Sequence, residues 1–183
     1  MNKPIFLQGE RLYLRPISED DSERYFLMMF NQETRRFTGS QRSFTKEQIQ
    51  RYIADQSHDS SRLLLLIALK EDHSVIGDIQ LLDIDPLNRN CYLRISLDDP
   101  RHQGKGYGNE AMKLMLDYAF GILNLHRIEL NVYAYNDRAI RLYEKLGFKK
   151  EGVQRDALFY DHTYHDSIIM SMLEDEYRER YRK

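Results

Sequence analysis

Three glycines within five positions, next to positively charged side chains, are the residues of this sequence best suited to chemistry. The stretch RHQGKGYG at 101–108 holds Gly104, Gly106 and Gly108 together with Arg101, His102 and Lys105. Glycine inside regular structure costs roughly 0.5–1 kcal/mol relative to alanine, so this stretch is expected to be a loop that needs bare backbone. Free N–H groups at a helix start, with the positive end of the helix dipole, bind anions. The sequence therefore predicts a phosphate-binding loop, and a plain strand-to-helix turn is the alternative.

The spacing of these glycines excludes two common phosphate-binding motifs. The pattern GxxxxGK[ST] of nucleoside triphosphatases does not occur in the chain. The dinucleotide pattern GxGxxG fails at its last interval, because Gly108 follows Gly106 after one residue. The acidic residue that this motif requires ~20 positions further on, at the end of the next strand, is also missing. Kinase, GTPase and NAD-dependent dehydrogenase functions are therefore disfavoured.

A second segment with chemical potential is NVYAYNDRAIRLYEKLGF at 131–148. Asn136 is typical of a helix N-cap, and Gly147 is typical of the residue that ends a helix. Tyr143 lies between them, and a phenol with a pKa of about 10 stays protonated at neutral pH and can donate a proton. The alternative is a core aromatic residue, since Ala139 and Leu146 lie on the same helical face.

Hydrophobic periodicity places these segments in a mixed α/β or α+β domain that spans residues 1–183. Strands are expected at 11–16, 63–69, 75–84, 91–97, 128–135, 148–153 and 167–172. Helices are expected at 18–29, from 45 onward, at 108–120, from 136 to 147, and as a solvated terminal helix within 174–183. Residues 31–43 are expected to be irregular, and a polar segment is expected between the last two strands.

Composition and cysteine content exclude several other classes of protein. Lys and Arg number 27 against 29 Asp and Glu, and a net charge of −2 disfavours a nucleic-acid binder. One cysteine, Cys91, allows no internal disulfide, and the six histidines form no HExxH pair, so no metal site is expected. The longest apolar run, 63–69, is far shorter than the ~20 residues of a membrane span, and the N-terminus is not a signal peptide. A cytoplasmic protein without membrane contact is expected.

The glycine loop and the 131–148 segment together resemble the GNAT superfamily of N-acetyltransferases. Residues 103–108 are similar to its Q/R-x-x-G-x-G/A loop, and 131–148 to its strand–Asn–helix block with a Tyr and a closing Gly-Phe. The resemblance covers roughly 10–173, and its specific part is 91–148. The stretches GERLYLRPISEDD and EGVQRDALFYDHTYHDSIIMSM are most similar to the ribosomal-protein N-acetyltransferase branch and the related bacterial spermidine acetyltransferases.

This resemblance implies a mostly antiparallel central sheet flanked by helices, with acetyl-CoA as the cosubstrate. The 91–97 and 128–135 strands would splay apart to form the coenzyme slot, and Arg101, His102 and Lys105 would screen its phosphates. The residues that the resemblance assigns to coenzyme binding are Ile95, Ser96, Leu97, Gln103, Gly104, Lys105, Gly106, Tyr107, Gly108, Asn109 and Asn136.

The resemblance also implies direct attack of an amine on the thioester in a ternary complex, with Tyr143 protonating the leaving sulfur. No general base is assigned, because Tyr92 stands where many members of this branch carry Glu, and Arg94 replaces a small residue. Asp78, Glu129 and Asp161 remain candidates, each expected to be an ordinary exposed acid. Cys91 is expected to pack in the core rather than carry an acyl group.

The acceptor is expected to be a primary amine, with a protein or peptide N-terminal amine in first place and a small cationic amine in second place by a slim margin. The acceptor pocket of the family lies at the N-terminal helices and the late hairpin. The basic residues Arg35, Arg36 and Arg42 favour a protein or peptide N-terminal amine. The acidic residues Asp156, Asp161 and Asp166 favour a small cationic amine such as spermidine or spermine. A non-catalytic acetyl-CoA sensor or interaction module is the alternative of another class, and a monomer or homodimer is expected.

Overall fold

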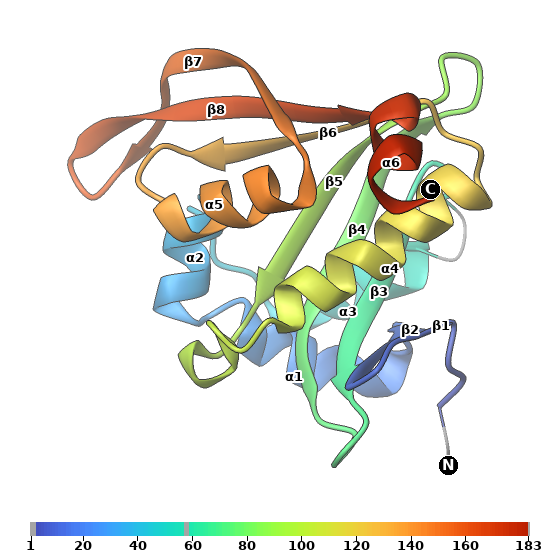
Figure 1. Cartoon of the computed structure of the whole chain (residues 1–183). Helices are drawn as coiled ribbons and strands as arrows, with labels where there is room; N and C mark the ends of the chain where they lie inside the picture. The colour runs from blue at the N-terminus through green and yellow to red at the C-terminus, as the bar shows by residue number, and fades with distance from the viewer. Residues whose placement is uncertain (1–2, 57–58, 183) are drawn as a thin grey trace. The chain divides into compact units, whose positions relative to one another are not determined.

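The structure is a computed structural model that describes residues 3–56 and 59–182 (Figure 1). Two compact units form from interleaved segments, the first from Met1–Leu82 and Arg94–Met115 and the second from Asp83–Leu93 and Leu116–Lys183. The described strands follow the hydrogen-bonded order β1-β2-β3-β4-β5-β6-β8-β7. The α/β class is therefore confirmed, while a single domain over 1–183 stays a prediction.

The first unit is built on antiparallel strands, which are β1 (Leu7–Gln8), β2 (Leu12–Pro16), β3 (Leu63–Leu69) and β4 (Val75–Asp85). Of these, β2, β3 and the first part of β4 are buried. β2 pairs with β3, and β3 pairs with β4 through partners such as Leu66 and Asp78. The expected strands at 11–16, 63–69 and 75–84 are thus confirmed.

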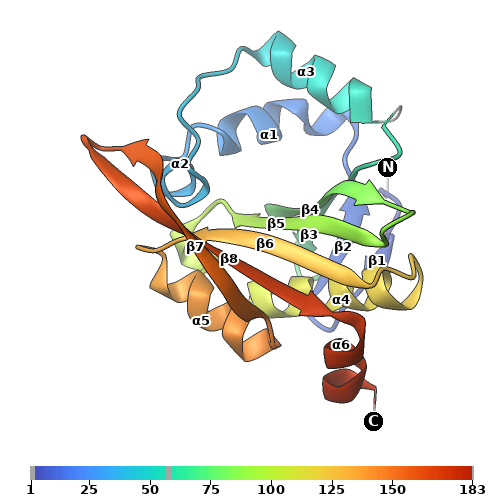
Figure 2. The same cartoon turned by 90° about the horizontal axis from the view of Figure 1, so that it is seen from above.

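Two helices cover one face of these strands, as Figure 2 shows. A short 3-10 turn (Glu19–Asp21) leads into α1 (Ser22–Met28), and α3 (Lys46–Asp55) packs beside it. Their buried partners form one cluster with β3, made of Tyr25, Met28, Ile49, Ile53, Leu64 and Leu66. Burying each such side chain stabilises the fold by about 1.5–3 kcal/mol. The capping boxes expected at Ser18 and Thr45 are present.

The expectation of irregular structure at 31–43 is wrong, because α2 (Gln32–Thr38) lies there. Asn31 caps it by accepting a hydrogen bond from the Thr34 amide at 2.9 Å, and Gly39 ends it with a φ of 67°. Thr34 is its one buried residue, so the segment has no apolar stripe to reveal a helix.

The second unit contains a mixed sheet around β6 (Arg127–Tyr133). β6 pairs in parallel with β5 (Asn90–Leu97) over Asn90–Tyr92, and antiparallel with β8 (Thr163–Leu173). β8 pairs antiparallel with β7 (Lys149–Tyr160). One parallel pairing among antiparallel ones agrees with the mostly antiparallel sheet that the family resemblance implies, and the splay of β5 from β6 stays a prediction.

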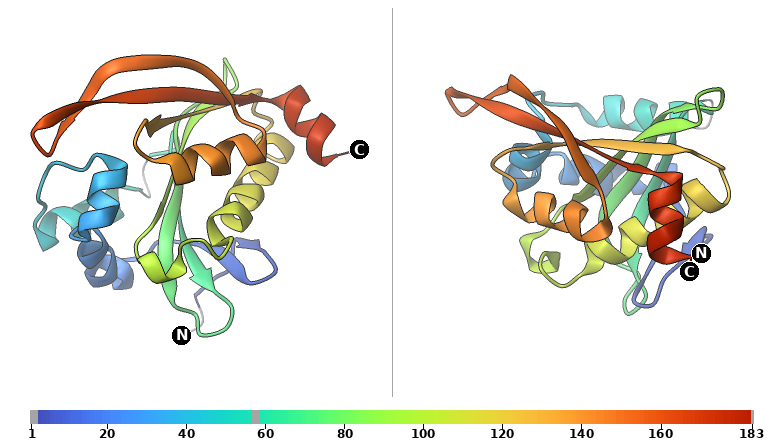
Figure 3. Two further views of the ribbon diagram at one scale, coloured as in Figure 1. Left: turned by 60° about the vertical axis from the view of Figure 1, so that its left-hand side comes forward. Right: turned by 45° about the horizontal axis from the view of Figure 1, so that its top comes forward.

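The last hairpin is longer than the sequence predicts, as Figure 3 shows. The polar segment expected between 153 and 167 is strand for most of its length. Asp161 and His162 form the turn with φ values of 53° and 64°, which is the geometry of a tight hairpin turn. A register shift between Gln154 and Leu158 interrupts the alternation of apolar and polar residues, so the pattern does not reveal the strand.

Three helices complete the chain: α4 (Tyr107–Gly121), α5 (Asp137–Leu146) and α6 (Glu174–Tyr181). The apolar stripe expected on α4 is confirmed, since Met112, Met115 and Ala119 are fully buried. The expectation that α6 is solvated is wrong on one face. Tyr177 is buried, stacks on Phe120 with ring centroids 4.8 Å apart, and donates a 2.7 Å hydrogen bond to Asp117.

Candidate functional site

The glycine loop joins the 3-10 turn Pro100–His102 to the start of α4. Gly104 and Gly106 have φ values of 72° and 84°, a left-handed conformation that disfavours any residue with a side chain. Gly106 directly precedes the helix and has no side chain with which to cap it. The first amides of α4 have no carbonyl partner within the helix. The loop therefore has the geometry that an anion site at a helix start requires.

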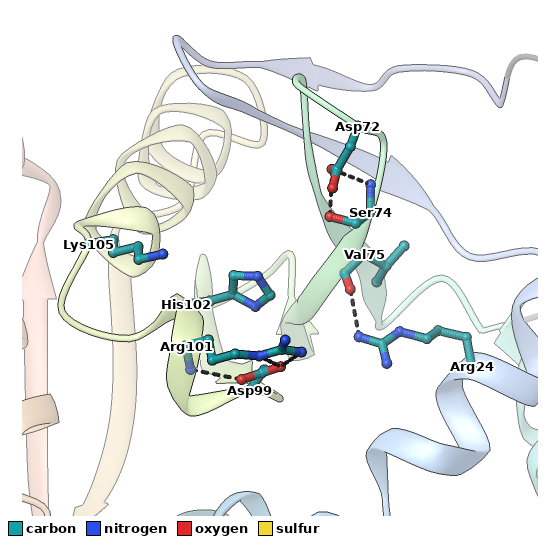
Figure 4. A pocket seen from close by; sticks show the side chains of 8 residues that line it. All are labelled: Arg24, Asp72, Ser74, Val75, Asp99, Arg101, His102 and Lys105. Atoms are coloured by element: carbon teal, nitrogen blue, oxygen red, sulfur yellow. Dashed lines mark hydrogen bonds and ion pairs between the residues drawn. The ribbon is translucent and has the colours of Figure 1, made fainter.

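A polar cavity of about 650 Å³ lies beside this loop in the first unit (Figure 4). Its lining residues are Arg24, Asp72, Ser74, Val75, Asp99, Arg101, His102 and Lys105. The two acids are already paired: Asp72 accepts hydrogen bonds from Ser74, and Asp99 accepts three from Arg101. Hydrogen bonds from Arg101 lower the pKa of Asp99 to about 2. The lining is therefore mixed in charge, and an anion bound beside it would depend on the backbone amides of the loop as well as on Lys105.

One lining residue, Arg24, is paired with a buried acid that the sequence analysis missed. Asp98 follows β5 and is 6% exposed, and Arg24 forms an ion pair with it while donating to the Val75 carbonyl at 2.7 Å. Within the described residues, Oδ1 of Asp98 and Nδ1 of His102 are buried without a hydrogen-bond partner. Burial raises the pKa of Asp98. The sequence Asp98-Asp99 does not indicate that burial raises the pKa of one acid while hydrogen bonds lower the pKa of the other.

The backbone of β5 offers its groups to opposite edges in alternation. The Asp98 amide donates to the Ile76 carbonyl at 3.1 Å, and the Ser96 carbonyl lies against Gly77, where a Cβ would collide with it. Ser96 and Asp98 therefore face β4, and the backbone groups of Ile95 and Leu97 face the opposite edge. The predicted pairing with a coenzyme arm thus concerns Ile95 and Leu97 more than Ser96.

In the second unit, α5 carries the other two predicted site residues. Asn136 is buried, and its Oδ1 accepts a hydrogen bond from the Ala139 amide at 3.2 Å, so its expected capping role is confirmed. Tyr143 is 7% exposed and packs against Phe148. Burial, with a smaller contribution from Tyr92, raises the pKa of Tyr143. The phenol therefore stays protonated well into alkaline pH, and its position agrees both with a proton donor and with a core aromatic residue.

The candidate bases occupy very different surroundings. The expectation that Asp78 is an exposed acid is wrong, because it is 1% exposed on β4 and accepts a 2.5 Å hydrogen bond from Gln80. Burial raises its pKa, although the Arg94 charge opposes this. Asp161 is exposed as expected, and Glu129 forms a 2.7 Å ion pair with Arg127. The sequence did not reveal that β4 is buried on both faces at Asp78.

The single cysteine is a packing residue in this structure. Cys91 is 4% exposed on β5, and burial raises the pKa of its thiol to about 12. A thiol with so little thiolate is a poor nucleophile, which agrees with the predicted core role.

The described residues contain no group of three or more His, Cys, Asp or Glu that could hold a metal ion. Among the helices of residues 3–56 and 59–182, none has the length and apolar character needed to cross a bilayer.

Comparison with known families gives a match over most of the chain. The family model described as "Acetyltransferase (GNAT) domain" matches residues 11–149. The spermidine N(1)-acetyltransferase of Vibrio cholerae serotype O1 is 37% identical over 107 residues, which are 58% of this chain and 61% of that relative. The uncharacterized N-acetyltransferase YokL of Bacillus subtilis is 29% identical over 176 residues, covering 92% of this chain and 93% of the relative.

Solved structures give the same picture. A crystal structure of the spermidine N-acetyltransferase from Vibrio cholerae in complex with CoA and spermine matches with a TM-score of 0.86 and 28% identity, over 91% of this chain and 98% of that one. Another Vibrio cholerae structure of this enzyme is dodecameric, with a TM-score of 0.82 and 27% identity over 93% of this chain and 98% of that one. The expected monomer or homodimer stays a prediction, which size-exclusion chromatography with light scattering can test.

Proposed function

This chain belongs to the GNAT acetyltransferase family, and from that premise we propose that it transfers an acetyl group from acetyl-CoA to a primary amine. The observation that carries the proposal is the open start of α4, preceded by two glycines in left-handed conformation. Such a helix start accepts a diphosphate through its amides, without a cationic side chain for every oxygen.

The residues around the loop fit the coenzyme. The amides from Gly104 to Asn109 would hold the diphosphate, while Lys105 on the cavity wall adds positive charge. The outward backbone groups of Ile95 and Leu97 would hydrogen-bond the amide-bearing arm, as a strand edge does. Asn136, in the second unit, is assigned to this arm by the family resemblance alone, and its side chain keeps N–H donors after capping α5 through its oxygen.

When bound, acetyl-CoA supplies the acetyl group as a thioester. The amine nitrogen forms a bond to the acetyl carbon, the carbon–sulfur bond breaks, and the amine releases a proton to water. Tyr143 is assigned to donate its hydroxyl proton to the departing sulfur and to recover one from solvent. Burial raises the pKa of Tyr143, so its hydroxyl is protonated at neutral pH and can donate a hydrogen bond or a proton to the departing sulfur.

An aliphatic polyamine is the acceptor that we place first. The named relatives from Vibrio cholerae and Escherichia coli are spermidine N(1)-acetyltransferases, at 37% and 33% identity. The acids Asp156 and Asp161 are exposed on the β7–β8 hairpin and suit a cationic substrate. A protein N-terminal amine, favoured by Arg36 and Arg42 near α2, is placed second. We also propose that the reaction takes place in the cytoplasm, since a chain with one cysteine lacks the internal disulfides typical of proteins from oxidising compartments.

A non-catalytic acetyl-CoA sensor is the second candidate function. The observation that favours it is the burial of the candidate base Asp78, which is 1% exposed and too deeply buried to meet an acceptor directly. The family resemblance, in addition, implies a carboxylate at the position that Tyr92 occupies. A sensor would bind coenzyme through the same glycine loop and would leave Tyr143 as a packing residue.

One assay separates these functions. Thiol release from acetyl-CoA is measured with spermidine, spermine, putrescine and a peptide with a free N-terminus, and the products are identified by mass. We expect spermidine-dependent thiol release and a mass gain of one acetyl group. Coenzyme binding without amine-dependent thiol release would support the sensor, and release with the peptide alone would reverse the order of the acceptors.

A further inference from the structure

We propose that Arg11, on the turn between β1 and β2, is a positioning residue for the coenzyme: it fixes the peptide between Lys105 and Gly106 so that the Gly106 amide faces the diphosphate. This inference rests on the proposed coenzyme function of the loop. Nothing in the sequence patterns links residue 11 to the glycine loop, which lies more than ninety positions away.

The contacts of Arg11 join the N-terminal turn to the end of the loop and to the start of α4. Its Nη1 donates to the Lys105 carbonyl at 2.8 Å, and its Nε donates to Oε2 of Glu110 at 3.0 Å. Its guanidinium lies over the Tyr107 ring, 4.8 Å from the centroid. The Arg11 and Leu12 amides donate to Oε1 of Glu110 at 2.8 and 3.3 Å. One side chain thus contacts the loop, the first residue of α4 and its first turn.

Because the peptide bond is planar, the bond from Arg11 to a carbonyl also fixes the direction of the next amide. In a trans peptide the carbonyl and the following N–H point in opposite directions. The bond from Arg11 to the Lys105 carbonyl therefore directs the Gly106 N–H away from Arg11. Gly106 has a φ of 84°, a region in which glycine moves easily, so the loop alone would not hold this orientation. A Cβ on Gly106 would lie 3.2 Å from Nη2 of Arg11, which shows how closely the guanidinium approaches.

Arg11 also offsets a charge that opposes anion binding. Glu110 lies in the first turn of α4, where its carboxylate stabilises the helix dipole but would repel a diphosphate. Burial acts to raise the pKa of Glu110, but hydrogen bonds from Arg11 and Leu12 outweigh it and hold the pKa below its usual value. Glu110 is therefore ionised, and the adjacent guanidinium compensates it. Gly9 makes room for this pair, since a Cβ there would lie 2.5 Å from Oε1 of Glu110.

An arginine is required at this position because the side chain contacts three groups at once: the Glu110 carboxylate, the Lys105 carbonyl and the Tyr107 ring. A planar guanidinium can donate to a carboxylate and a carbonyl while lying flat on an aromatic ring, whereas a lysine ammonium makes a compact point contact. The Arg11 side chain is 49% exposed, so its ion pair contributes little to folding stability. Its effect is therefore expected on coenzyme affinity more than on unfolding.

The test compares Arg11→Met with Arg62→Met, which removes another partly exposed, ion-paired arginine of the same unit. Calorimetry with coenzyme A is expected to show Kd raised about tenfold in Arg11→Met, or about 1.4 kcal/mol, and unchanged in Arg62→Met. Steady-state assays with spermidine are expected to show KM for acetyl-CoA raised by a similar factor, with kcat within about twofold. With acetyl-S-pantetheine, which lacks the diphosphate, kcat/KM of Arg11→Met is expected to match wild type.

These outcomes keep the inference separate from the proposed function. The positioning role would be overturned, even in an active enzyme, if Arg11→Met bound coenzyme A with a Kd within twofold of wild type. It would also be overturned if kcat/KM fell equally with acetyl-CoA and with acetyl-S-pantetheine. Failure of wild-type protein to acetylate any amine would refute the transferase function, while the calorimetric comparison would still test Arg11. If Arg11→Met does not fold, Arg11→Lys is measured alone. An ammonium group cannot reproduce the planar set of guanidinium donors. The Kd of Arg11→Lys for coenzyme A is therefore expected to rise at least about threefold, and an unchanged Kd would overturn the proposal.

Discussion

The starts of α4 and α5 solve the same problem in opposite ways. α5 begins at Asn136, whose side chain satisfies the Ala139 amide at 3.2 Å. α4 begins after Gly106, which has no side chain, and the nearby acid Glu110 is bonded to the β1–β2 turn instead. A capped helix start is complete by itself, whereas an uncapped start held in a fixed conformation is ready for an external acceptor. The capped start of α5 serves the fold, and we assign the uncapped start of α4 to binding the diphosphate.

This contrast assigns different kinetic effects to the two helices. Changes at the start of α4 should alter coenzyme affinity, because its amides bind a part of the cosubstrate that does not react. Changes at Tyr143 on α5 should alter the chemical step, because the phenol is assigned to the leaving sulfur.

The largest expected effect is that of Tyr143→Phe. Loss of the proton donor should lower kcat by about 10²-fold, within the usual range for acid–base groups, and leave coenzyme A affinity within about twofold. Stopped-flow or steady-state thiol release with saturating acetyl-CoA and spermidine measures it. Tyr177→Phe is the matched control, since Tyr177 is equally buried in the same unit and donates to Asp117. That control should lose stability but keep kcat. An unchanged kcat in Tyr143→Phe would remove the residue from the mechanism.

The next effect in size concerns Gly106→Ala. A side chain at a φ of 84° is strained and would contact Arg11, so the loop should lose the amide orientation that binds the diphosphate. We expect Kd for coenzyme A to rise about tenfold, with kcat at saturation nearly unchanged. Gly152→Ala is the control, because that glycine has open space around it. If both variants bind coenzyme equally well, the contrast between the two helix starts fails.

A smaller effect is expected from Asn136→Ala. Loss of the cap should lower the free energy of unfolding by about 1 kcal/mol, measured by denaturant titration. Asn136→Asp keeps an accepting oxygen and should restore this stability, but it lacks the N–H donors assigned to the coenzyme arm. KM for acetyl-CoA should therefore stay raised in Asn136→Asp. Full recovery of both quantities would show that Asn136 serves the fold alone.

The smallest expected change is in the alkaline pH profile. The proton donor must be protonated to act, and burial raises the pKa of Tyr143 above the usual tyrosine value of 10.0. Activity that depends on this proton is therefore lost only as pH rises through this raised value, and kcat should not fall between pH 8 and pH 10. A fall in kcat with an apparent pKa near 9, in protein that stays folded, would contradict Tyr143 as the donor.

Local chemistry was readable from the sequence, and long-range pairing was not. Glycine at 104 and 106, Asn136 and Gly147 each act within a few residues, so their conformations followed from residue type. The burial of Asp78 depends on the packing of both faces of β4, which no local pattern shows.

Two other features escaped prediction for related reasons. The ion pair of Arg11 with Glu110 joins residues 99 positions apart, and only the fold brings them together. The β7–β8 hairpin extends through a register shift that breaks the two-residue period on which strand prediction depends.

The most direct test of the central claim is calorimetric titration of coenzyme A into the purified wild-type protein and into Gly106→Ala. Saturable binding at one site per chain in wild type, weakened about tenfold in the variant, is the predicted result. Absence of binding to the wild-type protein would contradict the assignment of the α4 start as a diphosphate site, and with it the proposed acetyl transfer.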